Sequence, residues 1–263
     1  IKRRLPMLKF ERQRYIENEI NKKGSVTISE LSKVLEVSEE TIRRDLKELE
    51  MFNKLIRTHG GAYISEVEDK GIPIELRAKF LSNEKELMAD FVVKNIINEN
   101  ETILLDSSTT CYTLAKKIVL EDLKITIATN SLRIATLFES KPENTQLIML
   151  GGKFRKRSSS FIGYPATNSI NKLLADKCFI SCPAIDITHG LLDNNQFEAQ
   201  IRLSMILHSA KVYLVADHTK FSDSAEHIIT SLSKVNSIIT DKYPIPEWEN
   251  LFNEMEIPFS TVL

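Results

Sequence analysis

The chain lacks any uninterrupted apolar stretch of about 18 residues, the length that a membrane-spanning helix requires. It also lacks the short apolar core of a secretory signal peptide. We therefore expect a soluble, cytoplasmic protein with no membrane partner. The 263 residues are enough for two domains whose cores need no covalent staples.

Cysteine is scarce as well, with three in the chain, and this does not suggest an oxidising compartment. Cys178 and Cys182 fall in a predicted strand, where four residues span about 13 Å, too far for a disulfide. Two thiols without a nearby third and fourth ligand also make a poor zinc site. We expect these two and Cys111 to be small core residues, and we expect neither a metal nor a cofactor.

The net charge of −1 conceals an asymmetry between the two ends of the chain. Residues 1–60 hold 14 Lys and Arg against 10 Asp and Glu, a net of +4, whereas residues 61–263 hold 21 against 26, a net of −5. A basic small domain joined to an acidic larger one suits nucleic-acid binding by the first. Without Lys2, Arg3 and Arg4, which precede the first methionine, the excess falls to +1, so local motifs carry more weight.

The stretch from Val37 to Glu50 predicts a helix with two different faces. Ser38 is a good N-cap, acidic residues follow in the first turn, and no Gly or Pro interrupts the stretch. At about 100° per residue, one face is apolar and the other is cationic. The apolar stripe contains Ile42, Leu46 and Leu49, and the cations are Arg43, Arg44 and Lys47. Taken alone, this pattern fits a solvated charged face as well as a surface that meets anions.

The neighbouring segments favour nucleic acid. Residues 27–30 have the form of a capping box that opens a short helix, and a tight turn separates it from the helix that follows. This is the helix-turn-helix arrangement, in which the second helix enters the DNA major groove. An earlier helix at about 9–23 covers the pair, and residues 55–64 predict a β-hairpin that forms a wing, with Gly60 and Gly61 as its turn. We expect DNA contacts from Ser38, Thr41, Arg43, Arg44, Lys47, Arg57 and His59, the last two on the phosphate backbone.

These residues resemble the N-terminal domain of the DeoR family of bacterial transcriptional regulators. The family pattern is Val-Ser, then Thr-Ile-Arg-Arg-Asp-Leu, then an Arg before a Gly-Gly wing. The chain meets this pattern at Val37, Ser38, Thr41 to Leu46, Arg57, Gly60 and Gly61. The resemblance implies a winged helix-turn-helix domain, which we expect at residues 1–64, followed by a linker at 65–82.

Residues 83–263 predict a larger, mainly parallel α/β domain. After a helix at about 83–98, short apolar runs without strict alternation are separated by helical segments, which is typical of strands covered on both faces. The runs are 102–105, 125–128, 147–150, 178–182, 212–216 and 237–239. In such sheets, ligands bind beyond the carboxyl ends of the strands.

Polar segments follow several of these predicted strands. Hydroxyls and backbone N–H groups at a helix start suit phosphate, although ordinary capping by Ser and Thr explains the same residues. Basic residues stand close by at 153–157. For Asp186 and Lys220, a local turn partner or an exposed charge is an equal alternative to a ligand contact. We expect effector contacts from Asp106, Ser107, Ser108, Thr109, Thr110, Thr129, Asn130, Ser131, Gly151, Gly152, Arg155, Asp186, Glu198 and Lys220.

The resemblance to the DeoR family extends over this domain too. It implies a fold like that of ribose-5-phosphate isomerase and an effector that is a phosphorylated sugar or a related metabolite. Two departures narrow the backbone options of the expected site: Ser108 replaces the usual Gly of the first loop, and residues 181–184 replace a Gly-rich turn. Arg202 also stands where the family often has Lys.

Three functions are compatible with these patterns. The first is a DNA-binding transcriptional regulator, a repressor of sugar or carbohydrate metabolism genes, which acts as a homo-oligomer (dimer or tetramer) and is controlled by a phosphorylated sugar. The second is an isomerase-like enzyme, for which Asp186 and Glu198 are the candidate bases. The third is a DNA-binding module whose α/β domain only oligomerises. We expect the first function and no catalytic residue.

Overall fold

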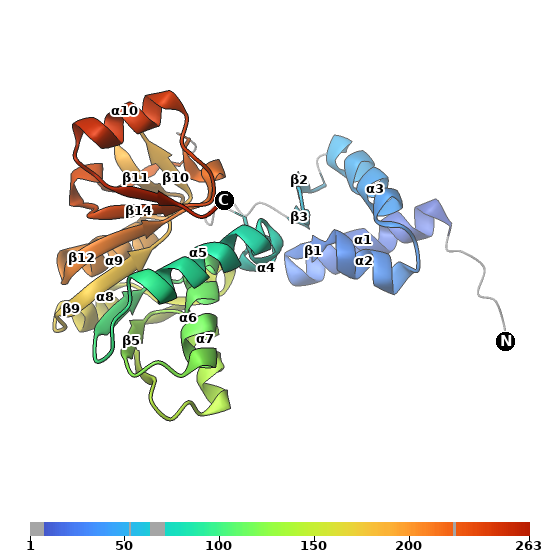
Figure 1. The fold of residues 1–263 in the computed structure, drawn as a ribbon. Helices are drawn as coiled ribbons and strands as arrows, with labels where there is room; N and C mark the ends of the chain where they lie inside the picture. Colours follow the sequence, from blue (N-terminus) through green and yellow to red (C-terminus); the bar gives the residue numbers. More distant parts are fainter. Residues whose placement is uncertain (1–7, 53, 64–71, 223–224) are drawn as a thin grey trace. The chain divides into compact units, whose positions relative to one another are not determined.

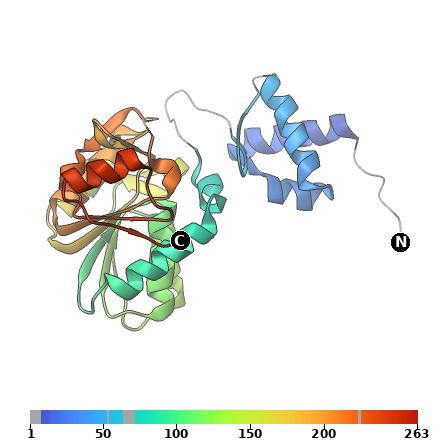
Figure 2. The same cartoon turned by 45° about the horizontal axis from the view of Figure 1, so that its top comes forward.

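The computed structural model describes residues 8–52, 54–63, 72–222 and 225–263 of the chain. The chain divides into two compact units, Ile1–Phe80 and Leu81–Leu263. Figures 1 and 2 show the elements of each unit, coloured along the sequence. No helix in the described ranges combines the length and the apolar character that crossing a bilayer takes.

The first unit is a bundle of three helices with a small antiparallel sheet. Helices α1 (Lys9–Lys23), α2 (Ile28–Leu35) and α3 (Glu39–Met51) enclose a core of buried aliphatic side chains. Strand β3 (Gly61–Tyr63) pairs with both β1 (Ser25–Thr27) and β2 (Ile56–Thr58). The predicted helix-turn-helix and wing are confirmed, except that residue 64 lies outside the described residues and that β1 was not predicted.

Side-chain caps begin the second and third helices where the sequence predicts them. Thr27 Oγ1 accepts a hydrogen bond from the N–H of Glu30 at 3.3 Å, and Ser38 Oγ accepts one from the N–H of Thr41 at 3.2 Å. Each such cap contributes about 1 kcal/mol to stability. Leu46 of α3 is fully buried, which adds roughly 1.5–3 kcal/mol. Local signals and tertiary packing therefore agree on the position of α3.

A short helix, α4 (Ile74–Lys79), lies within the stretch that we expected to be a linker. Ile74 and Leu76 are buried, and Lys79 Nζ donates to Thr27 Oγ1 at 3.0 Å and to Ser29 Oγ at 3.1 Å. These contacts attach α4 to the helix-turn-helix. The expectation of a linker is therefore wrong for α4, because a single apolar turn between polar residues gives too weak a periodic signal; residues 65–71 lie outside the described residues.

The second unit is built on a seven-stranded sheet of order β15-β14-β12-β9-β4-β5-β6, in which every neighbouring pair is parallel. This confirms the predicted α/β class. The strands are β4 (Thr102–Leu105), β5 (Thr126–Thr129), β6 (Gln146–Met149), β9 (Ala175–Ile180), β12 (Ser209–Val215), β14 (Ser237–Thr240) and β15 (Phe259–Thr261).

Helices cover both faces of this sheet (Figure 2). Alternate residues of its central strands pack on opposite sides. In β9, Phe179 packs with α5 (Ser82–Asn95), α6 (Thr109–Glu121) and α7 (Leu132–Thr136). Its neighbours Cys178 and Ile180 pack with the helices of the other face, which are α8 (Tyr164–Ile170), α9 (Gln196–Leu207) and α10 (Pro246–Glu254). Because both faces are buried, the strands read as continuous apolar runs.

Two small antiparallel sheets complete the second unit, and neither was predicted. Strands β7 (Lys153–Arg155) and β8 (Ser160–Ile162) form a hairpin after β6. Strands β10 (Ala184–Asp186), β11 (Gly190–Asp193) and β13 (His227–Thr230) form the other sheet. All three cysteines are buried and free, which agrees with the expectation that they are core residues.

Of the two adjacent glycines in the wing, Gly61 is the one that cannot carry a side chain. A Cβ added at Gly61 would lie 2.0 Å from the Val26 carbonyl oxygen, whereas one added at Gly60 would meet nothing closer than 4.0 Å. We expect Gly61→Ala to destabilise the first unit by about 1–3 kcal/mol through overpacking, and Gly60→Ala to change it little. Hydrogen exchange of the α1–α3 amides in the full chain measures this difference. Equal protection of the two variants would contradict the packing of β1 on β3.

Candidate nucleic-acid interface and effector site

The exposed face of α3 carries the cations expected to meet DNA. Arg43, Arg44 and Lys47 are exposed, and the side chain of Arg44 is 77% exposed. Arg43 pairs with Glu39 at 3.0 Å, and Arg44 pairs with Glu40 at 3.7 Å, both one helical turn apart. Exposed pairs of this kind contribute less than about 1 kcal/mol, so phosphate oxygens can replace the glutamates.

Ser38 and Thr41 lie at the N-terminus of α3, as predicted. Their hydroxyl oxygens are 2.9 Å apart, and Ser38 Oγ also caps the N–H of Thr41. Both hydroxyls are therefore engaged in starting the helix. Each still has lone pairs or a rotatable proton with which to bind a phosphate oxygen.

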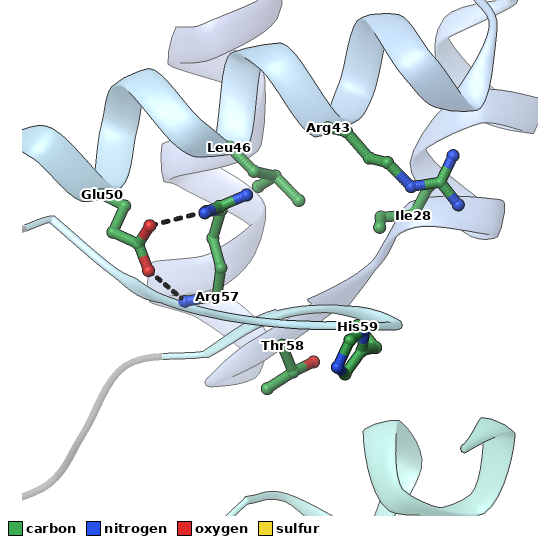
Figure 3. A pocket seen from close by; sticks show the side chains of 7 residues that line it. All are labelled: Ile28, Arg43, Leu46, Glu50, Arg57, Thr58 and His59. Carbon is green, nitrogen blue, oxygen red and sulfur yellow. Dashed lines mark hydrogen bonds and ion pairs between the residues drawn. The ribbon is translucent and has the colours of Figure 1, made fainter. Parts of the chain in front are cut away.

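An open groove of about 360 Å³ lies between α3 and the wing (Figure 3). Arg57 reaches from β2 toward Glu50 of α3, and His59 lies at the turn of the wing. Three of the predicted DNA contacts, Arg43, Arg57 and His59, thus border one groove. The residues that line it are Ile28, Arg43, Leu46, Glu50, Arg57, Thr58 and His59.

A buried ion pair fixes the recognition helix on its inner side. Asp45 of α3 is 1% exposed and binds Arg12 of α1 through two contacts, from Nε to Oδ2 and from Nη2 to Oδ1, the second at 3.1 Å. The hydrogen bond with Asp45 raises the pKa of Arg12 above its ordinary value. Sequence reasoning missed this pair, although Asp45 lies on the apolar side of α3 between Ile42 and Leu49.

In the second unit, Glu198 of α9 is the centre of a buried hydrogen-bond network. Its Oε1 accepts from Ser158 Oγ and Ser160 Oγ, each at 2.6 Å, and its Oε2 accepts from Ser107 Oγ at 3.1 Å. Burial raises the pKa of Glu198, but Arg202 and the serine hydroxyls outweigh burial, so the pKa lies below its ordinary value. Glu198 is therefore ionised at neutral pH and accepts hydrogen bonds through both oxygens, which joins the first loop to the serines at 158 and 160.

Arg202 neutralises the acidic groups of this network. Its guanidinium is 4% exposed; Nε donates to Asp106 Oδ2 at 2.8 Å and to the Ser181 carbonyl at 2.9 Å, and Nη1 pairs with Asp193. Glu198 lies one helical turn earlier on α9, with Oε2 3.7 Å from Nη1. Sequence reasoning named Arg202 without this role and missed Asp193 and the serines at 158 and 160, because most of these contacts join segments that are distant in the chain.

The expected effector residues of the first two loops come together at the carboxyl ends of β4 and β5. Residues 106–110 and 129–131 are all buried there. Ser108 caps α6 by accepting from the N–H of Cys111 at 3.0 Å, with an extended backbone at φ −69°. The replacement of the family's Gly by Ser108 therefore introduces no strain, and no residue of 181–184 has positive φ.

Two buried acceptor atoms at this edge have no hydrogen-bond partner among the described residues. Asn130 donates from Nδ2 to the Phe161 carbonyl at 2.9 Å, and its Oδ1 is left over. Asp217, after β12, accepts from Thr219 through Oδ1, and its Oδ2 is left over. Because buried polar atoms are almost always satisfied, these oxygens are candidate acceptors for the hydroxyls of a ligand.

Gly151 and Gly152 follow β6 and are exposed. They lead into β7, whose Arg155 donates from Nη1 to Ser158 Oγ at 2.8 Å and lies 3.4 Å from Glu198 Oε1. The third predicted loop thus joins the same network as the first. Its cation is already bound to Glu198, so Arg155 contributes to the charge balance of the site.

The carboxylate of Asp186 binds its own loop, whereas the ammonium of Lys220 has no partner among the described residues. Asp186 Oδ1 accepts from the N–H of Thr188 at 3.0 Å and from that of His189 at 2.6 Å, so it is the local turn partner that we left open. The pKa of Asp186 lies below its ordinary value, mainly because the backbone N–H of His189 donates a hydrogen bond to the carboxylate. Oδ1 of Asp186 thus serves its own loop, and the effector contact of Asp186 stays a prediction.

Lys220 ends the short 3-10 helix η3 (His218–Lys220) after β12. It is half-buried, and its ammonium has no hydrogen bond or ion pair to a described residue. Burial raises the pKa of the Cys182 thiol to about 12, while the charges of Arg202 and Lys220 act in the opposite direction. Lys220 thus lies within electrostatic reach of Cys182, and its ammonium is available for an anion.

Comparison with known proteins gives matches along most of the chain. The family profile described as "DeoR-like helix-turn-helix domain" matches residues 12–67, and the profile described as "DeoR C terminal sensor domain" matches residues 81–242. The HTH-type transcriptional regulator YulB of Bacillus subtilis is 37% identical over 89% of this chain and 90% of its own length. The L-fucose operon activator of Escherichia coli is 34% identical over 89% of this chain and 96% of its own length.

A third relative, the HTH-type transcriptional repressor GlcR of Bacillus subtilis, is 29% identical over 90% of each chain. Among solved structures, ribose 5-phosphate isomerase A from Methanocaldococcus jannaschii aligns with a TM-score of 0.39 and 14% identity, covering 54% of this chain and 55% of its own.

The Glu198 network predicts an acid-sensitive second unit. Folding lowers the pKa of Glu198, so its contribution to stability is present above about pH 4.3 and is lost as the pH falls through the lower folded value. We expect Glu198→Gln to reduce this loss in acid and to destabilise the unit by roughly 1–3 kcal/mol at neutral pH. Urea unfolding followed by the fluorescence of Trp248, the single tryptophan, measures both. The control is Glu247→Gln on the surface, and an identical pH dependence in wild type and Glu198→Gln would contradict the prediction.

Proposed function

Because this chain belongs to the DeoR family of helix-turn-helix transcriptional regulators, we propose that it represses carbohydrate-metabolism genes under the control of a phosphorylated sugar or a related metabolite. The single observation that carries the proposal is the pairing of a cationic recognition helix in one unit with a strand-end site in the other. In this proposal the first unit binds operator DNA, and the second binds the effector and forms a homodimer or a tetramer.

The DNA-binding role is supported by the charges of α3 and the wing. The inner side of α3 is held by the buried pair of Arg12 and Asp45, so its outer side is presented as a rigid surface. The side chain of Arg44 is 77% exposed, and its guanidinium can read a guanine in the major groove. Arg57 and His59 are exposed on the wing and suit contacts with phosphate.

The effector role is supported by the carboxyl edge of the parallel sheet. Residues 107–110 begin α6 with hydroxyls and backbone N–H groups, which favour an anion at the helix N-terminus. Asn130 Oδ1 and Asp217 Oδ2 suit hydroxyl groups, and the ammonium of Lys220 suits a phosphate. A molecule with both hydroxyls and a phosphate matches this set of partners, and the name of the L-fucose operon activator fits a carbohydrate.

The direction of control is a further part of the proposal. The relatives include one named as a repressor and one named as an activator, so sequence similarity alone does not distinguish repression from activation. A repressor needs only to occupy DNA, which the winged domain provides by itself. In a homodimer on a two-fold operator, half-sites about 10 base pairs apart make binding sensitive to the relative placement of the two DNA-binding units. An effector that favours another placement then releases the operator.

Substitution of Arg44 tests whether this side chain contacts DNA bases. We expect Arg44→Ala to weaken binding to a selected operator by about 1–3 kcal/mol and to relax its sequence preference. Fluorescence anisotropy with operator and random duplexes measures both effects. Lys94→Ala removes the same charge from α5 of the second unit and is the matched control. If Arg44→Ala lost equal affinity for both duplexes, Arg44 would contact phosphate only.

Lys220 tests the effector site. Ligand binding to the native state raises stability by RT ln(1 + [L]/Kd), about 2.7 kcal/mol at a hundred times Kd. We expect a thermal-shift screen of phosphorylated sugars and polyols to give a rise with one compound, and Lys220→Ala to abolish it while DNA binding is retained. The control Lys234→Ala, on the surface of the same unit, should respond as wild type. An unchanged response of Lys220→Ala would remove Lys220 from the site.

A further inference from the structure

Glu50 makes an unusual connection between the recognition helix and the wing. Its Oε1 accepts from the backbone N–H of Arg57 at 3.0 Å, and its Oε2 accepts from Nε of the same residue at 2.6 Å (Figure 3). Strand β2 is an edge strand, because the sheet order is β1-β3-β2. Glu50 therefore satisfies a backbone donor on the open edge of the wing as well as a side chain.

The position of Glu50 is electrostatically unfavourable for a DNA-binding protein. It lies in the same groove as Arg43, Arg57 and His59, where its carboxylate repels phosphate. The hydrogen bonds from Arg57 hold the pKa of Glu50 below its ordinary value, so the carboxylate is charged at neutral pH. A residue whose only effect was its charge would weaken DNA binding.

The geometry of Arg57 gives Glu50 a different role. Glu50 uses Nε and the backbone N–H, and neither Nη atom of Arg57 has a hydrogen-bond partner among the described residues. Both side chains are 37% exposed, so the guanidinium is partly shielded and partly open to solvent. Two parallel Nη donors are the arrangement that binds two oxygens of a phosphate.

We infer that Glu50 is a positioning residue for DNA binding: it locks Arg57 and the edge of the wing against α3, so that the two Nη atoms meet one backbone phosphate. The inference rests on the proposed DNA-binding function. The two possible effects of Glu50 have opposite signs. If Glu50 acts only by its negative charge, its removal strengthens DNA binding; if it positions Arg57, its removal weakens DNA binding.

The test measures the affinity of the full chain for a selected operator and for random DNA at several salt concentrations. We expect Glu50→Ala to weaken binding to both duplexes by a similar factor of about 5–10, and Glu50→Gln, which keeps an acceptor oxygen, to weaken it less. Arg57→Ala should weaken binding and lower the salt slope by about one. The double variant should bind no more weakly than Arg57→Ala, since Glu50 acts through Arg57.

Glu48→Ala is the matched control, because it removes the same charge from α3 outside the groove, where Glu48 pairs with Lys9. Tighter or unchanged binding by Glu50→Ala and Glu50→Gln, or additive losses in the double variant, would overturn the inference. Should Glu50→Ala fail to fold by circular dichroism, Glu50→Gln and the double-variant cycle built on it decide the question. Failure of the proposed function would be distinct, since wild type would then select no operator.

Discussion

The second unit depends on the neutralisation of one buried guanidinium. Arg202 is 4% exposed, and a charge at that depth without partners would cost several kcal/mol. Its partners come from the ends of β4 and β11 and from the segment after β9, and Asp106 is 96 residues away in the chain. Because the carboxylates must converge on the guanidinium, the loops at the carboxyl edge of the sheet are held in one arrangement. Asn130 Oδ1, Asp217 Oδ2 and the Lys220 ammonium take no part in this network, and they are the groups that we propose as partners of the effector.

The first unit uses the same device beneath its DNA-binding surface. Asp45 and Arg12 form a buried pair on the inner side of α3, whereas Arg43 and Arg44 pair loosely with glutamates in solvent. Breaking a buried pair costs about 3–5 kcal/mol, and an exposed one contributes less than about 1 kcal/mol. Buried charges thus set the position of the helix, while exposed charges remain free to exchange partners. Rigid support and labile surface charge are both needed for recognition of a polyanion.

Much of this architecture follows from local sequence signals. The caps at Thr27 and Ser38 and the apolar runs of the parallel strands place most helices and strands, because these signals act over a few residues. The β7–β8 hairpin and the β10-β11-β13 sheet were missed, since short strands carry no period of their own and pair across the chain. The role of Arg202 was missed because its partner Asp106 lies 96 residues away in the chain. For Asp186, one sequence pattern fits both a strand-end ligand and a turn, and the bonds to residues 188 and 189 show the turn.

The central claim is that the two units are coupled, so that effector and operator influence each other's binding. The most direct measurement is a reciprocal titration of the full chain: operator affinity with and without saturating effector, and effector affinity with and without saturating operator. Thermodynamic linkage requires the two ratios to be equal. Our account predicts equal ratios that both show mutual weakening, by a factor in the range of about 5–150 that is usual for allosteric coupling. A ratio of one in both titrations would show that the second unit binds its ligand without controlling DNA, and would contradict the account.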